Sequence, residues 1–122
     1  MDRILVVQDS TLINSMLRSR LEPAGFFIET VESAEVGLQK LKESTYHLII
    51  LDIKLPGMSG DQACRLIKNQ EAMRHIPILF LSAQDEIKLS ALAVQAGAQG
   101  YILLPFEGAA LIQKINNTLK KI

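Results

Sequence analysis

Asp9, Asp52 and Ser82 each stand where a short apolar run of the sequence ends, and their side chains are well suited to do chemistry. A carboxylate at the end of a buried strand is costly unless something pairs with it. Two carboxylates held close together repel each other, which raises a pKa unless a cation lies between them. Oxygen ligands of this kind suit Mg²⁺, a hard cation that keeps several of its water molecules. The residue types therefore predict a magnesium site wherever these side chains meet.

Five apolar runs of strand length alternate with five segments of helical periodicity, and these elements must position the polar residues. The runs are residues 4–8, 26–31, 46–52, 77–82 and 100–104. Between the runs, apolar residues recur at spacings of three and four, which is typical of helices packed on one face. Ser33 is suited to begin a helix and Gly97 to end one. Strict alternation of this kind predicts an α/β fold, a parallel sheet with helices on both faces.

The five strands are expected in the order 2-1-3-4-5, and the polar Glu29 and Thr30 of the second run suggest an edge strand. In open parallel sheets, ligands bind at the carboxyl ends of the strands, near the point where the strand order reverses. We therefore expect Asp9 to face Asp52 at this edge, with Ser82 beside them.

Length and composition limit the classes of protein that need to be considered. The 122 residues are enough for one domain with a real hydrophobic core. Thirteen basic and thirteen acidic residues cancel, which argues against nucleic acid as a partner. The single cysteine, Cys64, fits a reducing compartment, and no apolar stretch approaches the length of a membrane span. With no signal-peptide pattern at the N-terminus, we expect a cytoplasmic protein without a membrane partner.

Four stretches of the sequence, in this order, carry a resemblance to a known family. They are "ILVVQDS" (4–10), "LIILDIKLPGMSG" (48–60), "PILFLSA" (77–83) and "GAQGYILLPF" (97–106). Over nearly its whole length the chain resembles the receiver domains of two-component response regulators, including the chemotaxis response regulator. The resemblance implies one receiver domain over residues 1–122 with a flavodoxin-like (β/α)5 sandwich fold. It also implies a signalling domain rather than an enzyme, one that at most assists its own phosphorylation and dephosphorylation.

The resemblance implies a role for each matching residue. Asp52 is the expected phosphoacceptor, which takes a phosphoryl group from a histidine of a sensor histidine kinase. Asp9, Asp52 and the backbone carbonyl of Lys54 are the expected ligands of Mg²⁺. Ser82 is expected to hydrogen-bond the phosphoryl group, and Tyr101 to change rotamer in response and relay the change to a downstream effector protein or domain. The peptide bond between Leu104 and Pro105 is expected to be cis, as this loop commonly is in the family.

Two positions depart from the family pattern. Receivers usually have a second acid at the position of Gln8 and a lysine at the position of Leu104. Three acids and a lysine carry a formal charge of −2, and Asp9 with Asp52 alone also carries −2, so the two departures match in charge. The fixed positive charge for the phosphoryl group is nevertheless absent, and we expect weak phosphorylation and weak Mg²⁺ binding. The ammonium group of Lys54 either reaches the phosphoryl group in compensation or points into solvent.

Simpler structural interpretations stand beside these roles. Asp9, alone or with its neighbour Ser10, is suited to cap the first helix. Ser82 is also explained as a turn residue and Tyr101 as a ring packed on a helix. Leu104 is most simply read as additional core, and Cys64 as an unreactive core residue.

Other functions fit the sequence less well than a receiver. A phosphatase of the haloacid dehalogenase type needs a second aspartate two positions after the nucleophile, where this chain has Lys54. A flavin carrier needs a phosphate-binding loop after the first strand, but "QDSTLIN" has no glycine, and no P-loop pattern is found. The remaining alternative is a receiver fold used as a phosphorylation-independent protein-interaction module.

Overall fold

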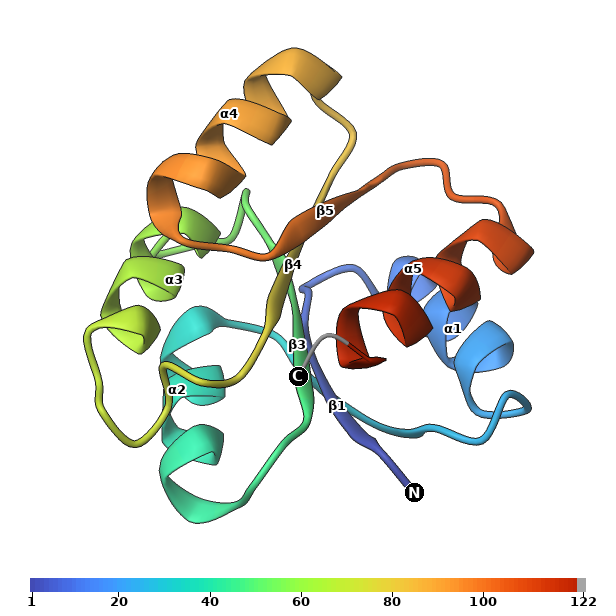
Figure 1. The fold of residues 1–122 in the computed structure, drawn as a ribbon, viewed down its shortest axis with the longest axis horizontal. Coiled ribbons are helices and arrows are strands. Elements are labelled where there is room, and N and C mark those ends of the chain that lie inside the picture. The colour runs from blue at the N-terminus through green and yellow to red at the C-terminus, as the bar shows by residue number, and fades with distance from the viewer. Residues whose placement is uncertain (121–122) are drawn as a thin grey trace.

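The computed structural model describes residues 1–120, whose five strands form one parallel sheet in the predicted order, β2-β1-β3-β4-β5 (Figure 1). The chain alternates strand and helix throughout: β1 (Arg3–Val7), α1 (Thr11–Leu21), β2 (Phe27–Val31), α2 (Ala34–Glu43), β3 (Leu48–Asp52), α3 (Gly60–Lys68), β4 (Ile78–Ser82), α4 (Glu86–Ala96), β5 (Gly100–Leu103) and α5 (Gly108–Lys120). β2 is an edge strand, as its polar residues suggested. The α/β architecture expected from the alternation is confirmed.

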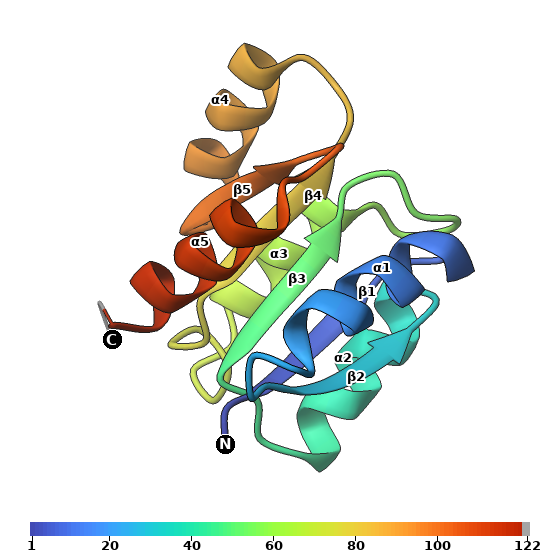
Figure 2. The same ribbon diagram turned by 90° about the vertical axis from the view of Figure 1, so that its right-hand side faces the viewer.

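The helices cover both faces of the sheet. α1 and α5 lie on one face, and α2 and α3 lie on the other, with α4 beside α3 (Figures 1 and 2). The chain leaves β1 for β2 on one side and returns to β3 on the other, so the strand order reverses between β1 and β3. The carboxyl ends of these two strands therefore border the crevice in which such sheets bind ligands.

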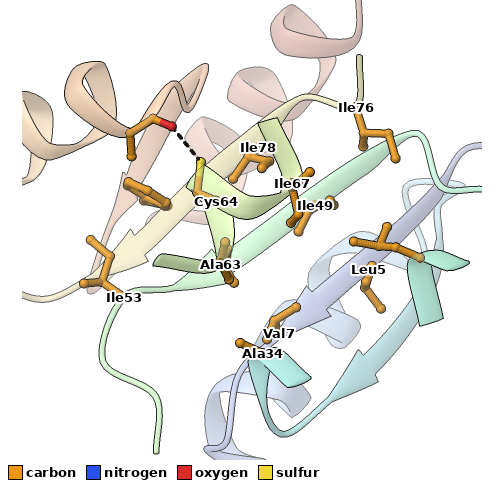
Figure 3. Close-up of a cluster of buried hydrophobic side chains, with 14 of the residues drawn as sticks. Leu5, Val7, Ala34, Ile49, Ile53, Ala63, Cys64, Ile67, Ile76 and Ile78 are labelled. Atoms are coloured by element: carbon orange, nitrogen blue, oxygen red, sulfur yellow. Dashed lines mark hydrogen bonds between the residues drawn. The ribbon is translucent and has the colours of Figure 1, made fainter. Parts of the chain in front are cut away.

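Alternate residues of the strands supply two separate hydrophobic cores. On the face of α2, α3 and α4, strand residues such as Leu5, Ile49 and Ile78 are fully buried with helix residues such as Ile67 (Figure 3). Cys64 also lies in this core, and its Sγ is 3.4 Å from the carbonyl oxygen of Ala96 in α4. The thiol thus joins α3 to the end of α4.

The second core lies under α1 and α5. It contains the other set of strand residues, such as Ile4, Ile50 and Leu81, with Leu17 from α1 and Ile115 from α5. All five of these side chains are fully buried. Because the central strands are buried on both faces, they read as continuous apolar runs in the sequence.

Serine residues begin three of the helices. The hydroxyl oxygens of Ser10, Ser33 and Ser59 accept hydrogen bonds from backbone N–H groups in the first turns of α1, α2 and α3. Gly97 ends α4 in the left-handed conformation, with φ of 86°. The predicted roles of Ser33 and Gly97 are confirmed, and the cap of α1 is Ser10 rather than Asp9.

The strands are shorter than the apolar runs that predicted them. β1 ends at Val7, before Gln8, and β5 ends at Leu103, before Leu104. β3 begins at Leu48, where its pairing with β1 starts, and Tyr46 before it donates its hydroxyl to the carboxylate of Glu29, with 2.7 Å between the two oxygens. The Leu104–Pro105 peptide is cis, as expected.

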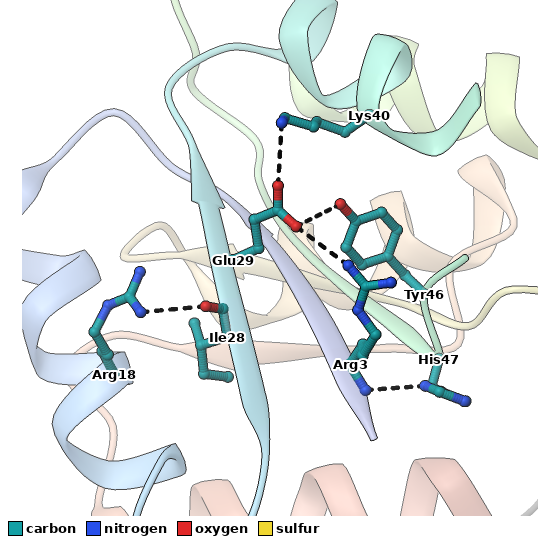
Figure 4. A network of polar contacts seen from close by, with 7 residues as sticks. All are labelled: Arg3, Arg18, Ile28, Glu29, Lys40, Tyr46 and His47. Atoms are coloured by element: carbon teal, nitrogen blue, oxygen red, sulfur yellow. Dashed lines mark hydrogen bonds and ion pairs between the residues drawn. The ribbon is translucent and has the colours of Figure 1, made fainter. Parts of the chain in front are cut away.

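A polar network centred on Glu29 ties β1, β2 and α2 together (Figure 4). Glu29 lies 3.5 Å from the guanidinium of Arg3 and 3.3 Å from the ammonium of Lys40. The hydrogen bond from Tyr46, with the charges of Lys40 and Arg3, lowers the pKa of Glu29. Burial and the hydrogen bond to Glu29 raise the pKa of Tyr46 to about 12. The network thus links the edge strand β2 to β1 and to α2.

In the part of the chain that the structure describes, no helix is both long enough and apolar enough to cross a membrane.

Candidate functional site

The polar residues at the ends of β3 and β4 and directly after β1 meet at the carboxyl edge of the sheet. Together with neighbouring apolar residues they line a cavity of about 290 Å³. The lining residues are Gln8, Ile13, Asp52, Lys54, Ser82, Ala83, Gln84 and Leu104. The fold thus brings together Asp52 and Ser82, as predicted, and adds Gln8 to them.

Asp52 is the last residue of β3 and lies between the two strands that flank it. It pairs with Leu81 of β4, and its partly buried side chain faces the cavity. Burial raises the pKa of Asp52 above its ordinary value, and the negative charge of Asp9 raises it further. The backbone N–H of Lys54, 3.3 Å from Oδ1 of Asp52, and the side-chain amide of Gln8 act in the opposite direction. Asp52 is therefore a carboxylate without a full counter-charge.

Asp9 lies at the edge of the site rather than inside it. Its side chain is exposed and does not line the cavity, although its charge acts on Asp52. The position inside belongs to Gln8, which is 2% exposed. The buried polar residue that follows β1 is thus an amide, and Asp9, the expected metal ligand, lies at the rim of the site, where its charge still acts on Asp52.

Ser82 closes β4 and is 5% exposed. Its Oγ accepts a hydrogen bond from the backbone N–H of Gln84, with 3.1 Å between the heavy atoms. A hydroxyl that accepts one bond still carries its proton and can donate it to another oxygen. Ser82 thus combines the turn role suggested by its position with a free donor facing the same cavity as Asp52.

The loop between β3 and α3 carries Lys54 along the cavity. The side chain of Lys54 is exposed but lines the cavity with Asp52. The loop is held at its far end by Glu35 of α2, whose Oε2 accepts a hydrogen bond from the N–H of Met58 at 3.2 Å. It closes where the N–H of Gly60 donates to the carbonyl of Ile53, at 2.9 Å. The backbone of Lys54 is therefore held next to Asp52, while its ammonium group is free to move.

Leu104 supplies an apolar wall where receivers usually have a lysine. It is partly buried, packs against the core under α1 and α5, and lines the cavity with Ile13. Its backbone N–H donates to the carbonyl of Ser82, at 2.8 Å. Leu104 is thus part of the hydrophobic core, as the simplest interpretation of the sequence predicted. It brings no charge to Asp52.

Tyr101 does not lie in this cavity. Its hydroxyl donates to Oε2 of Glu86 in α4, at 2.8 Å, and the ammonium of Lys114 in α5 lies 5.1 Å from the ring centroid. The hydrogen bond to Glu86 raises the pKa of Tyr101. The ring therefore faces outward, between α4 and α5, on a strand next to the one that ends in Ser82.

The donor set suits a hard cation that keeps much of its hydration. The carboxylate of Asp52 lacks a counter-charge, and Asp9 adds a second negative charge within electrostatic reach. Among residues 1–120, no group of three or more histidine, cysteine, aspartate or glutamate side chains is placed to hold a metal ion. Two carboxylates and a backbone carbonyl fit Mg²⁺, which usually takes few protein ligands.

Gln8 is the site residue whose burial the sequence analysis did not predict. The family pattern marks it only as the position of a missing acid, whereas the structure buries it in the cavity that Asp52 lines. A signal was present, because a polar residue that directly continues a strand buried on both faces must find a buried partner.

Comparison with known proteins agrees with this geometry. The family described as the response regulator receiver domain matches residues 4–116. The chain is 32% identical over 119 residues to the transcriptional activator protein IrlR of Burkholderia pseudomallei, covering 98% of this chain and 51% of the relative. It is also 32% identical over 119 residues to the transcriptional regulatory protein ResD of Bacillus subtilis, covering 98% and 48%. The chain thus spans about half the length of these curated relatives.

Solved structures show the same fold. The chemotaxis protein CheY4 of Vibrio cholerae superposes with a TM-score of 0.90 at 26% identity, covering 97% of this chain and 98% of that one. The receiver domain of the sensor histidine kinase PA1611 of Pseudomonas aeruginosa, which has a magnesium ion coordinated in its active-site cleft, gives a TM-score of 0.89 at 26% identity, covering 98% of each chain. With its strand order, the polar edge of its sheet and the match over residues 4–116, the chain belongs to the receiver domain family of two-component response regulators.

Proposed function

We propose that the protein is a phosphoacceptor signalling domain and that Asp52 is the residue that carries the phosphoryl group. A carboxylate oxygen of Asp52 attacks the phosphorus of a phosphohistidine on a sensor histidine kinase. The P–N bond breaks as the new O–P bond forms, and the imidazole leaves as a neutral ring, because its other nitrogen already carries a proton. The observation that carries this proposal is the shared cavity, in which the carboxylate of Asp52 lies with the hydroxyl of Ser82.

Phosphoryl transfer depends mostly on positioning and on stabilisation of charge. Ser82 is placed to donate its hydroxyl proton to a phosphoryl oxygen, because its Oγ already accepts from Gln84 and is fixed by that bond. Asp9, Asp52 and the backbone carbonyl of Lys54 are the residues that would hold Mg²⁺. When bound, the ion neutralises charge on the phosphoryl oxygens and on the two carboxylates.

We expect the phosphorylated state to form weakly. Leu104 offers no cation to the phosphoryl group, and a hydrogen bond to a charged partner is worth about 1.5–3 kcal/mol. This corresponds to a loss of roughly ten- to a hundredfold in the equilibrium. Lys54 lines the cavity, and its flexible ammonium group supplies part of this missing charge.

The signal is then passed on as a conformational change. A phosphoryl group bound to Ser82 draws in the loop after β4, which leads directly into α4 and Glu86, the partner of Tyr101. Release of that hydrogen bond allows Tyr101 to change rotamer. A downstream effector protein or domain recognises this change. The balanced charge of the chain argues against nucleic acid as a direct partner of this domain.

A second candidate is a pseudo-receiver that binds its partner without phosphorylation. It is favoured by one observation: Leu104 and Ile13 form an apolar wall beside Asp52. In that case the outer surfaces of the fold bind the partner, and Asp52 is not phosphorylated.

Incubation with a small phosphodonor separates the two candidates. Intact-protein mass spectrometry should show one added phosphoryl group on the wild type in Mg²⁺, and none on Asp52→Asn or after the metal is chelated. A wild type that takes up no phosphoryl group from the donor or from a histidine kinase would support the interaction module instead.

A further inference from the structure

β2 is an edge strand, so one of its two sides has no neighbouring strand. Its hydrogen bonds to β1 show which backbone groups face that free side. The N–H of Phe27 donates to the carbonyl of Asp2, and the carbonyl of Val31 accepts from the residue that follows β1. Because the backbone groups of successive residues in a strand point to opposite sides, Ile28 and Thr30 turn their N–H and C=O groups to the free edge.

The guanidinium group of Arg18, a residue of α1, lies along this free edge (Figure 4). Its Nη1 donates to the carbonyl of Ile28 at 3.2 Å, and its Nη2 lies 3.5 Å from Oγ1 of Thr30. Nη1 also donates to Oε2 of Glu22, at 2.9 Å, where α1 ends. The planar guanidinium carries several N–H donors, so one side chain can bridge the helix and the edge of the sheet.

Without this cover, the edge of β2 would be able to pair with another strand. Among residues 1–120, the N–H of Ile28 and both backbone groups of Thr30 have no hydrogen-bond partner. A second copy of the chain offers the same free groups, and two such edges complement each other about a two-fold axis. In an antiparallel pair, Ile28 of each copy would exchange two hydrogen bonds with Thr30 of the other. The carbonyl of Ile28 is an acceptor that this pairing needs, and Arg18 occupies it.

We propose that Arg18 keeps the free edge of β2 closed to a second copy of this chain. The guanidinium group occupies the carbonyl of Ile28, and its charge would have to be moved or desolvated before another strand could approach. The ion pair with Glu22 is partly exposed, so it contributes more to the placement of the guanidinium than to stability. The inference involves neither Asp52 nor phosphorylation, and it does not depend on the proposed function.

Replacement of Arg18 by methionine tests the proposal. Arg18→Met keeps an unbranched apolar stem on α1 but removes every donor and the charge. Sedimentation velocity over a series of protein concentrations should show self-association stronger than that of the wild type by about tenfold or more. Arg20→Met removes the same charge from the exposed side of the same helix and should behave as the wild type does. The proposal is overturned if Arg18→Met associates no more strongly than either of these two proteins.

A proline at position 30 shows whether the association uses this edge. Proline lacks the N–H group, but the N–H of Thr30 faces the free edge, so pairing with β1 is retained. The double variant Arg18→Met/Thr30→Pro should associate as weakly as the wild type. If the association of Arg18→Met persists in the double variant, another surface is responsible and the proposal is wrong.

A measurement on the wild type keeps the proposal testable if a variant does not fold. The hydrogen bonds of Arg18 to Ile28 and Glu22 should slow rotation about its Nε–Cζ bond. At low temperature, its Nη–H protons should therefore give separate NMR signals. A single averaged signal would show that the guanidinium group does not hold the edge, and it would overturn the proposal.

Discussion

Gly60, the first residue of α3, packs so closely on the carbonyl group of Asp52 that a Cβ atom at position 60 would collide with it. The atoms in the way are backbone atoms of Asp52 and Ile53, so no side chain can move aside. Gly60→Ala should therefore shift the end of β3 and lower the free energy of unfolding by about 2–3 kcal/mol.

The matched control for this change is Gly108→Ala, at the first residue of α5. A Cβ atom there would meet only the side chain of Arg20, at 3.2–3.4 Å, which is free to move. The control should change the unfolding free energy by less than about 0.5 kcal/mol. Chemical denaturation of the two variants checks both values, and equal losses would show that the close packing at Asp52 is unimportant.

The fold was predictable from the sequence because each strand and helix is locally consistent. Strands buried on both faces appear as continuous apolar runs, and serine caps such as Ser33 mark the starts of helices. The exact ends of the strands were less predictable. Tyr46 reads as part of an apolar run, but its hydroxyl finds Glu29 on another strand, a contact that only the assembled sheet creates.

The site was predictable in its residues but not in its inner geometry. The carboxyl ends of adjacent strands bring Asp52 and Ser82 together whatever the local details. Which of two consecutive polar residues turns inward after β1 depends on the first turn of α1. Capping by Ser10 and its hydrogen bond to Gln8 place the amide inside and leave Asp9 at the rim, and these contacts form only in the folded chain.

Glu29 should stabilise the fold in a pH-dependent way. Its pKa is lowered in the folded state, chiefly by the hydrogen bond from Tyr46, so its contribution is present above its ordinary value of 4.5 and is lost as the pH falls through the lower folded value. Glu29→Gln should lower the unfolding free energy by about 1 kcal/mol at pH 7. The difference in unfolding free energy between Glu29→Gln and the wild type should disappear as the pH falls through this acidic range.

The exposed Glu32 offers a control in the same region, and Glu32→Gln should follow the wild type at every pH. If Glu29→Gln is as destabilising at the acid end of the range as at pH 7, the hydrogen bond and ion pairs of Glu29 do not supply the stability assigned to them.

Cys64 should resist thiol reagents in the folded protein. Burial raises its pKa from 9.0 to about 11, and the side chain is fully buried. The pKa change alone lowers the thiolate fraction near neutral pH about a hundredfold. Alkylation followed by mass spectrometry should be slow in the native protein and fast in denaturant. Similar rates in the two conditions would mean that α3 separates readily from α4.

Lys54 should contribute to binding of a phosphoryl mimic. Its ammonium group is the mobile cation on the wall of the cavity. Lys54→Ala should weaken binding of beryllofluoride in Mg²⁺ by about three- to tenfold, the loss of one partly exposed charge contact. Lys42→Ala, on the exposed side of α2, controls for net charge and should bind as the wild type does. If the two variants bind equally well, Lys54 points into solvent and does not replace the missing lysine.

The central claim is that Asp52 accepts a phosphoryl group, and that it does so poorly because Leu104 provides no cation. One comparison of rates tests this claim most directly. The rate of phosphoryl uptake from a small donor in Mg²⁺ is measured for the wild type, Leu104→Lys and Asp52→Asn by intact-protein mass spectrometry. We expect slow uptake by the wild type, uptake faster by about tenfold or more in Leu104→Lys, and none in Asp52→Asn. The account is contradicted if Leu104→Lys is no faster than the wild type although its structure shows the new ammonium group in the cavity, or if Asp52→Asn is still phosphorylated.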